Sequence, residues 1–490
     1  MKPELLFDRF REISAVPRES GNEAGMTAYL QAFAAEHGLE CRNDAIGNTV
    51  IAVPGRGKGV GADTIILQSH TDMVCVKAPG SAHNFLTDGI QLRVEQREEH
   101  GKVQDVLLGT DTTLGADNGM GVAAALAAGL DPAIENCPPL ELLFTIDEER
   151  GLTGAAQLDP SIITGTYLIN MDSEELGEIC ISCAGGRDMT SVWPLVRSAA
   201  SGGWKPITVS LTGLPGGHSG VQINEGRGNA IAMLLGAISD AAGTDEIRVS
   251  NITGGSKRNV IPSTCEVTLW ADAPVADRIA TELGSAAQLE AFKSALCIGA
   301  ELVKVSVSTP EPNAAGEPIG AAETRTVFAA ILAVPWGPQT MSEAVPGLVE
   351  TSNNVAVIST TDTAITLSCS TRSSAAGAIE TFQDIHRPAL QATGADVTHS
   401  DGYPGWEADR ENPLLKTAES VFAGVLGTSP KITAIHAGLE CGVLKGIVPR
   451  LRMISFGPDI RDAHTILERV LLSSVPTFYA CLTALLEEMC

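Results

Sequence analysis

The stretch "TIILQSHTDMV" (residues 64–74) joins an apolar run to an imidazole and a carboxylate. Such a short, continuous apolar run predicts a strand that is buried on both faces, as in a parallel α/β sheet. His70 and Asp72 follow two positions apart, and side chains at that spacing on an extended segment point the same way. Open α/β sheets place their sites beyond the carboxyl ends of their strands. This stretch therefore predicts both a fold class and the place of a site.

Strand-like and helix-like segments alternate on either side of this stretch. Helices are expected at about 3–15, 21–37, from Asp117 onward and briefly after Gly151, and strands at 48–54, 64–68, 140–146 and 166–171. Strands that alternate with helices predict a mostly parallel sheet with helices on its faces. The first part of the chain is therefore expected to belong to the α/β class.

The pattern changes between residues 187 and 395 and then returns. Within this range strands follow one another in pairs with helices between them, which is typical of an α+β domain. Beyond it we expect a helix near 412–425, strands at 431–438 and 451–458, and a final helix at 466–488. The sequence thus predicts an α/β domain split into 1–186 and 396–490, with an α+β domain inserted at 187–395.

Composition narrows the class of protein. With 490 residues and 44% hydrophobic side chains, the chain has ample material for two buried cores. Its formal net charge of −26 argues against binding to nucleic acid or to anionic membrane surfaces. No apolar window reaches the length of a transmembrane helix, and the first residues lack the apolar segment of a signal peptide. The 11 cysteines are dispersed, which fits a reducing setting, so we expect a cytoplasmic protein.

Four further segments place carboxylate or imidazole side chains after predicted strands or beside the ends of predicted helices. They contribute Asp117 at a helix start, Asp147, Glu148 and Glu149 after one strand, Asp172 after another, and His464 before the last helix. Each alone has a structural explanation, such as a helix N-cap, a charge near a helix dipole, or a turn. Together, five segments of one predicted domain supply the nitrogen and oxygen ligands that zinc accepts.

These residue types also indicate a division of roles. An aspartate with two oxygens can bridge two metal ions, and a carboxylate that binds no metal can take a proton from water. Asp72 can orient the ring of His70 from behind. Cys180 and Cys183 form a CxxC pair without a second pair to complete a zinc site, so we expect ordinary buried thiols there.

Seven motifs carry a family resemblance: "SHTDMV", "GTDTTLGADNGMGVA", "TIDEERGLTGA", "INMDSEELGEI", "GLPGGHSG", "HAGLECG" and "GPDIRDAHT". Together they span nearly the whole chain. The sequence resembles the aminoacyl-histidine dipeptidases, which are di-zinc metallopeptidases also called Xaa-His or carnosine-splitting dipeptidases. Their wider superfamily includes tripeptidases, carboxypeptidases and N-acyl-amino-acid deacylases.

The resemblance implies two zinc ions (Zn2+) in each chain, although manganese (Mn2+) or cobalt (Co2+) would tolerate similar ligands. One ion would be held by His70, Asp117 and Asp172, and the other by Asp117, Glu149 and His464. Asp117 would thus be the bridge. Glu148 would be the general base and later the proton donor, and Asp72 would be the partner of His70.

The resemblance also implies that the inserted domain is a lid and dimerisation domain that contacts the substrate. His218 would polarise the scissile carbonyl and stabilise the oxyanion. Asn259 and Arg372 would contact the substrate, with Arg372 holding its terminal carboxylate through two hydrogen bonds. The backbone at Gly438 would approach the same carboxylate.

We therefore predict a cytoplasmic di-zinc exopeptidase that hydrolyses unblocked dipeptides, including the Xaa-His (β-alanyl-histidine) type, and that forms a homodimer. The sequence leaves open whether His218 acts in its own chain or across the dimer. The nearest alternative is a related tripeptidase or N-acyl-amino-acid deacylase. A non-catalytic metal- or peptide-binding protein is a further alternative, but it would be expected to lack Glu148 or a ligand. For His436 and Glu440 we expect a structural role or a role in supporting the ligands, because ligands for both metal ions are already supplied.

Overall fold

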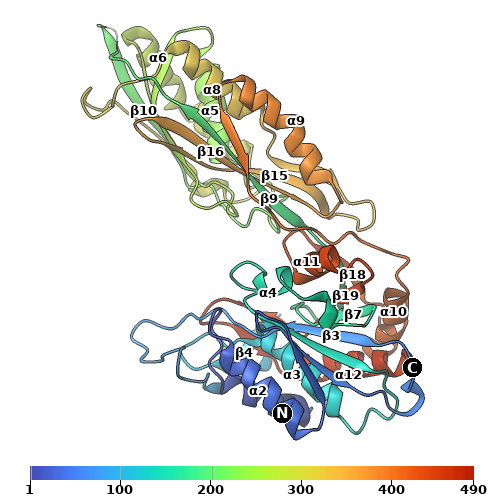
Figure 1. The fold of residues 1–490 in the computed structure, drawn as a ribbon. Helices are drawn as coiled ribbons and strands as arrows, with labels where there is room; N and C mark the ends of the chain where they lie inside the picture. The colour runs from blue at the N-terminus through green and yellow to red at the C-terminus, as the bar shows by residue number, and fades with distance from the viewer. Residues whose placement is uncertain (2, 100, 201) are drawn as a thin grey trace. The chain divides into compact units, whose positions relative to one another are not determined.

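A computed structural model of the chain describes residues 1, 3–99, 101–200 and 202–490, which form two compact units (Figure 1). Unit 1 comprises Met1–Cys183, Trp406–Ala434 and Leu439–Cys490, and unit 2 comprises Ala184–Gly405 and Ile435–Gly438. The sequence pattern places the limits of the insertion at 186/187 and 395/396. It gives no sign of the short return to unit 2 at 435–438.

The central sheet of unit 1 has the strand order β1-β2-β6-β3-β7-β19-β8-β18. Its strands are β1 Glu40–Asn43, β2 Thr49–Val53, β3 Ile65–His70, β6 Leu140–Thr145, β7 Tyr167–Asn170, β8 Glu178–Cys183, β18 Lys431–Ile435 and β19 Arg452–Ser455. Strands β6, β3, β7 and β19 pair in parallel, whereas β1 with β2, β2 with β6, and β8 with β19 pair antiparallel. Every residue of β3 and β6 is buried, as their unbroken apolar runs predict. The predicted parallel pairing holds for the four central strands, but the sheet as a whole is mixed and less parallel than predicted.

The helices of unit 1 follow the order that the sequence pattern predicts, except that α11 was not predicted. They are α1 Glu4–Ser14, α2 Ala24–Glu36, α3 Ala116–Leu130, α4 Thr153–Ala156, α10 Pro413–Leu426, α11 Glu440–Ile447 and α12 Val475–Glu488, with short 3-10 turns η1 Gly57–Gly59 and η2 Pro160–Ile162. Helix α3 is rich in alanine and glycine and is almost entirely buried. A Cβ atom at Gly121 would lie 2.5 Å from Ser69 Oγ and 2.9 Å from the Met171 carbonyl oxygen. Only glycine therefore allows α3 to lie this close to the strand ends.

The last part of unit 1 corrects one prediction. A helix was expected from residue 466, but α12 begins at Val475, with a proline in its first turn. Residues before it form β20 (Ile460–Arg461) and β21 (Arg469–Leu471), which join β5 (Lys102–Gly109) and β4 (Leu92–Glu99) in a small antiparallel sheet. The predicted helix start is wrong because pairing of Val470 with Leu107 overrides the local helical pattern. His464 consequently lies in the loop between β20 and β21.

Unit 2 is built on a second sheet, in the order β13-β10-β12-β11-β15-β16-β9-β17, with β14 also paired to β15. Its strands are β9 Gly185–Pro194, β10 Trp204–Thr212, β11 Ile247–Gly254, β12 Cys265–Asp272, β13 Lys304–Ser308, β14 Gly337–Met341, β15 Val349–Thr360, β16 Ala364–Ser373 and β17 Asp396–His399. Its helices are α5 Ala230–Ala242, α6 Ala273–Leu283, α7 Ala286–Ser294, α8 Ala321–Ala333 and α9 Ala378–Ala392, with the 3-10 turn η3 Ala300–Leu302. The neighbouring strands pair antiparallel. The predicted α+β class of this part is therefore confirmed.

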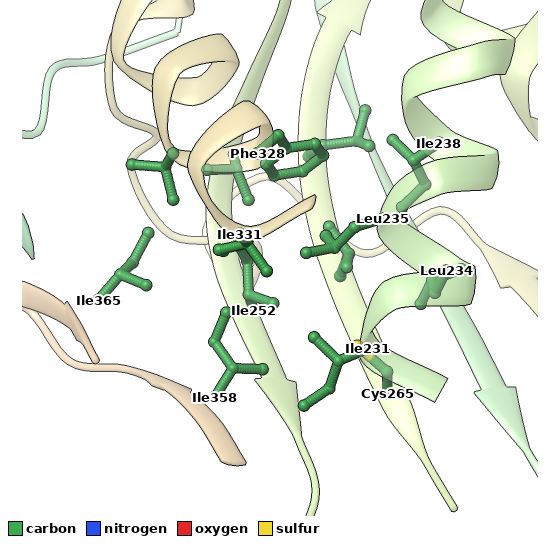
Figure 2. Packing of buried hydrophobic residues seen from close by; sticks show 14 of the residues in the cluster. Ile231, Leu234, Leu235, Ile238, Ile252, Cys265, Phe328, Ile331, Ile358 and Ile365 are labelled. Carbon is green, nitrogen blue, oxygen red and sulfur yellow. The ribbon is translucent and has the colours of Figure 1, made fainter. Parts of the chain in front are cut away.

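Helices α5 and α8 pack on this sheet through apolar side chains (Figure 2). Figure 2 labels Ile231, Leu234, Leu235 and Ile238 on α5, Phe328 and Ile331 on α8, and Ile252, Cys265, Ile358 and Ile365 on the strands. The spacing of the four α5 residues puts them on one helix face. Burial of this face stabilises unit 2 at about 25 cal/mol for each Å² of apolar surface removed from water.

In the part of the chain that the structure describes, no helix has both the length and the apolar character needed to cross a bilayer.

Candidate metal centre

Three neighbouring parallel strands of unit 1 bring predicted ligands to one edge of the sheet. Strand β3 ends at His70, residues 147–149 follow β6, and Asp172 follows β7. Because β6, β3 and β7 are adjacent and parallel, their carboxyl ends lie side by side. The fold itself therefore gathers residues from positions 70, 149 and 172.

Asp117 and His464 complete this group from other elements. Asp117 lies in the first turn of α3, and His464 lies in the loop before β21. The Oδ1 atom of Asp117 is 3.1 Å from His70 Nε2, and its Oδ2 atom is 3.1 Å from His464 Nε2. One carboxylate thus presents a separate oxygen to each of two imidazoles, which is the arrangement that a bridging ligand requires.

Two further contacts divide the group into halves that share Asp117. His70 Nε2 is 3.3 Å from Asp172 Oδ1, and His464 Nε2 is 3.0 Å from Glu149 Oε2. Zinc bonds of about 2.0–2.2 Å in tetrahedral geometry set neighbouring ligand atoms roughly 3.3 Å apart. The observed separations therefore suit ligand atoms around one ion in each half.

Buried carboxylate oxygens that lack hydrogen-bond partners show whether this group of residues suits a metal ion. Glu149 Oε1 is buried and has no hydrogen-bond partner among the described residues, and Asp172 Oδ1 is buried with the His70 ring as its close polar neighbour. In the described part of the chain, no lysine or arginine forms an ion pair with Asp117, Glu149 or Asp172. Several carboxylates gathered in this way are unfavourable unless a cation compensates them. The nitrogen and oxygen donors suit zinc, manganese or cobalt ions.

The side chains also perturb one another's pKa values. Hydrogen bonds to Asp117 and Glu149 raise the pKa of His464 to about 11. Burial lowers the pKa of His70, but Asp172 and Asp117 outweigh it and hold that pKa well above its usual value. Burial would raise the pKa of Asp117, yet the two imidazoles hold it below its usual value. Metal ions would replace the protons of these rings, so metal affinity should rise with pH.

Asp72 supports both a ligand and the loop that follows β6. It is fully buried, and its Oδ1 atom lies 3.4 Å from His70 Nδ1. Its carboxylate accepts the backbone N–H groups of Glu148 and Glu149 at 3.0 and 3.2 Å, and the hydroxyl of Ser20 at 2.7 Å. Burial would raise its pKa, but the contacts with His70 and Ser20 lower it to about 2. His70 Nδ1 lies 3.2 Å from the Asp72 carbonyl oxygen, nearer than the carboxylate, so the pairing of the Asp72 carboxylate with His70 stays a prediction.

Glu148 lies close enough to this group to interact electrostatically with His70, Asp172 and Glu149. Burial raises its pKa well above the usual value, and the nearby carboxylates of Asp172, Glu440 and Glu149 act in the same direction. His70 opposes them. A carboxylate whose pKa is raised holds a proton more readily and can therefore both take it up and return it.

A second acidic group, Glu23, Asp72 and Asp147, also has carboxylate oxygens close together. Its oxygens are already used, because Glu23 Oε1 accepts the N–H groups of Gly21 and Asp147 at 2.8 and 3.1 Å. Asp147 in turn forms an ion pair with Arg150 at 2.6 Å. We therefore assign no metal to it.

The predicted substrate residues lie in unit 2, and two of them line one cavity. Asn259 and Arg372 are among the lining residues of a cavity of about 640 Å³ in this unit. Arg372 is buried, its Nη1 donates a hydrogen bond of 2.7 Å to Tyr403 Oη, and its Nε has no partner among the described residues. Tyr403 was not predicted, since a single tyrosine in a Gly- and Pro-rich segment carries no sequence signal.

His218 and Gly438 have defined surroundings in the same unit. His218 Nδ1 accepts the backbone N–H groups of Gly220 and Val221 at 3.2 and 3.1 Å, which places the ring proton on Nε2. Burial and the charge of Arg372 lower the pKa of His218, so the ring is neutral near pH 7. At Gly438, a Cβ atom would lie 2.9 Å from the ring of Tyr403. Packing of that ring is therefore a structural reason for this glycine.

The two residues predicted to have structural roles are both buried. His436 donates or accepts a hydrogen bond of 2.7 Å with Ser352 in unit 2. Glu440 lies in unit 1 at the start of α11 and accepts hydrogen bonds from Gln68 and Thr145 at 2.6 and 2.8 Å. Glu440 thus joins α11 to β3 and β6, the strands that deliver the ligands.

Residues 66–488 match the profile of peptidase family M20/M25/M40. The chain belongs to this family. It is 33% identical over 502 positions to the cytosol non-specific dipeptidase of Escherichia coli strain K12, covering 100% of this chain and 98% of that protein. The crystal structure of an aminoacylhistidine dipeptidase from Vibrio alginolyticus is 33% identical, with a TM-score of 0.91 over 99% of this chain and 97% of that one. Aminopeptidase PepT from Bacillus cereus ATCC 10987 shares the fold, with a TM-score of 0.55 at 17% identity over 99% and 98% of the two chains. The predicted family resemblance and fold class are confirmed.

The buried carboxyl group of Glu440 predicts a pH-dependent stability. Burial raises its pKa from 4.5 to about 7, so the folded protein binds this proton more tightly than the unfolded chain. Its contribution to stability is therefore complete below the unfolded value and is lost as pH rises to about 7. In metal-free protein, Glu440→Gln should leave the free energy of unfolding in urea unchanged at pH 4.5. At pH 8 it should raise that free energy by an amount on the order of 2 kcal/mol.

Glu141→Gln is the matched control for this experiment. Glu141 is also buried, but hydrogen bonds from the N–H groups of Gly165 and Thr164 and from the Arg42 side chain outweigh burial and lower its pKa. Its substitution should destabilise the protein at pH 8. Equal destabilisation by both variants at pH 8 would contradict the assignment for Glu440.

Proposed function

We propose that this protein is a cytoplasmic dipeptidase whose two metal ions share the carboxylate of Asp117. One ion is assigned to His70, Asp117 and Asp172 and the other to Asp117, Glu149 and His464. The assignment depends on one observation: Asp117 Oδ1 lies 3.1 Å from His70 Nε2, and Asp117 Oδ2 lies 3.1 Å from His464 Nε2. Hydrolysis of dipeptides follows from membership of the peptidase family together with the full-length relationship to two dipeptidases. Zinc is the ion that we propose, and manganese and cobalt are the alternatives.

The chemistry divides between the ions and the side chains around them. When bound, the two ions would lower the pKa of a water molecule and polarise the peptide carbonyl. Glu148 takes the proton of the attacking water and then delivers it to the leaving amine, a use that its raised pKa supports. Asp72 holds the ring of His70 and the backbone of Glu148 in place throughout.

Unit 2 contributes the residues that we assign to substrate recognition and the interface of a homodimer. Arg372 binds the terminal carboxylate of the dipeptide, and its unpartnered Nε supports this role. Asn259 contacts the substrate, and Gly438 keeps the nearby backbone accessible. His218 donates its Nε2 proton to the carbonyl oxygen as negative charge develops there, either in its own chain or across the dimer. A free carboxyl end is thus part of what defines the substrate.

Replacement of Glu148 by glutamine tests the catalytic assignment. The amide keeps the shape of the side chain but cannot take up a proton, so kcat for a dipeptide such as Ala-His should fall by at least about 10²–10⁴-fold. Metal content by atomic emission should remain two ions for each chain, because Glu148 is not assigned as a ligand. Glu135→Gln, at an exposed position, is the control and should retain normal kcat. Normal turnover by the Glu148 variant would refute the role.

A substrate panel separates the dipeptidase from its rivals. We expect zinc-loaded protein to cleave Ala-His and other unblocked dipeptides at least tenfold faster, by kcat/KM, than a tripeptide or an N-acetyl amino acid. Preference for the tripeptide or the acetylated substrate would assign the protein to the alternative superfamily activities. Full activity after exhaustive chelation would remove the metal-dependent mechanism altogether.

The contact between Tyr403 and Arg372 predicts a specific kinetic change. Tyr403→Phe removes the hydrogen bond of 2.7 Å that holds the guanidinium, so KM for dipeptides should rise about five- to tenfold with little change in kcat. A dipeptide with an amidated carboxyl end should be cleaved equally poorly by the variant and the wild type. Tyr167→Phe, in unit 1, is the matched control. If Tyr403→Phe raised KM equally for the free and the amidated dipeptide, Tyr403 would not act through the grip of Arg372 on the terminal carboxylate.

A further inference from the structure

Glu468 binds the backbone of the segment that carries Asp117. Its carboxylate is buried and accepts four consecutive backbone N–H groups, those of residues 114–117, at distances of 2.8, 2.9, 2.7 and 3.3 Å. These groups form the amino end of α3, where the helix dipole also favours a negative charge. Glu468 therefore fixes the turn that aims Asp117.

The position of Glu468 in the chain connects two proposed ligands. It follows His464 by four residues and belongs to the segment that leads into β21. The same side chain thus ties the loop of His464 to the turn of Asp117. A shift of Glu468 would change the distance between His464 Nε2 and Asp117 Oδ2, now 3.1 Å.

Arg18 connects the turn before α3 to the residues that follow β3. It is buried, and its Nη1 donates to the carbonyl oxygens of Thr71 and Asp72 at 3.1 and 3.3 Å. Its Nη2 donates to the carbonyl oxygen of Gly115, in the turn that Glu468 also binds. A Cβ atom at Gly115 would lie 2.4 Å from this Nη2, so glycine is needed for the guanidinium to fit. Burial lowers the pKa of Arg18, and the charge of Glu468 is the largest opposing influence.

Buried charges are an expensive means of general stabilisation. Moving an arginine and a glutamate out of water carries a large desolvation cost, and apolar side chains of similar volume often stabilise a core equally well. The contacts described above go to the backbone of segments 71–72 and 114–117, which adjoin the proposed ligands. These contacts therefore suggest that the two charges fix the geometry of the proposed metal centre rather than stabilise the core.

We propose that Arg18 and Glu468 are positioning residues that hold the segments of His70, Asp117 and His464 in ligand geometry before any ion binds. The proposal rests on the metal centre described under the proposed function. It predicts that metal affinity depends on two residues that touch no metal ion. Partners behind metal ligands typically account for 10- to 100-fold in affinity.

The test measures zinc affinity by competition with a chromophoric chelator, without any peptide substrate. In Glu468→Gln the amide NH₂ faces two of the four N–H donors, so the zinc Kd should rise about 10- to 100-fold in folded protein. The visible absorption spectrum of the cobalt-loaded variant should also change. Arg18→Lys keeps the charge but cannot reach the three carbonyl oxygens, and it should weaken binding in the same direction.

Glu141→Gln again supplies the matched control. Glu141 is a buried carboxylate at the start of β6 that accepts the backbone N–H groups of Thr164 and Gly165, and its side chain makes no hydrogen bond to the segments 71–72 and 114–117. It should lower the melting temperature of the metal-free protein while leaving the zinc Kd unchanged. Unchanged Kd and cobalt spectra in the Glu468 and Arg18 variants would overturn the proposal, whatever their melting temperatures.

Hydrogen exchange in the wild type keeps the proposal testable if the variants fail to fold. The amides of residues 114–117 should be protected in metal-free protein, because Glu468 already binds them. Fast exchange that slows only when zinc is added would overturn the claim that the site is formed in advance. A wild type that binds no zinc would instead refute the proposed function, so the two failures are distinguishable.

Discussion

The two oxygens of Asp117 each face the ring of a different histidine, and the architecture of unit 1 can be understood from this requirement. Asp117 reaches its place because α3 lies against the strand ends, where the small residues of that helix allow close approach. His70 arrives at the end of a buried parallel strand, and His464 arrives on a loop from the other end of the chain. A centre of this kind needs both ends of the polypeptide to be folded together.

Such a concentration of carboxylates is unfavourable in a protein interior unless positive charge compensates it. In the described residues this charge comes from histidine rings whose pKa values are raised by their carboxylate neighbours. Metal ions would take over that role and release the protons, which couples the centre to pH. Asp72, Arg18 and Glu468 hold the backbone around it, so that the ligands do not depend on their own flexible side chains for position.

Short-range pattern and topology together explain why some of the candidate ligands could be expected to lie close together. Apolar runs define β3, β6 and β7, and residues 70, 147–149 and 172 follow their ends, so parallel pairing alone brings these residues together. The residues from 466 onward, just after His464, were assigned to a helix, because the strand pairing of Val470 with a distant hairpin leaves no local signal. Arg18 and Glu468 were missed for a related reason: they bind backbone atoms far away in the sequence, and such contacts produce no periodicity. The return of residues 435–438 to unit 2 is likewise a long-range feature.

The substrate residues of unit 2 have local geometry that agrees with their assigned chemistry, including a neutral His218 with its proton on Nε2 and a buried Arg372 held by Tyr403. The shared carboxylate is nevertheless the central claim. Anomalous diffraction at the zinc edge, on crystals of zinc-loaded protein, tests it most directly. The account predicts two peaks about 3.5–4 Å apart, each bonded to a different oxygen of Asp117. A single peak, or a pair of ions that Asp117 does not join, would contradict it.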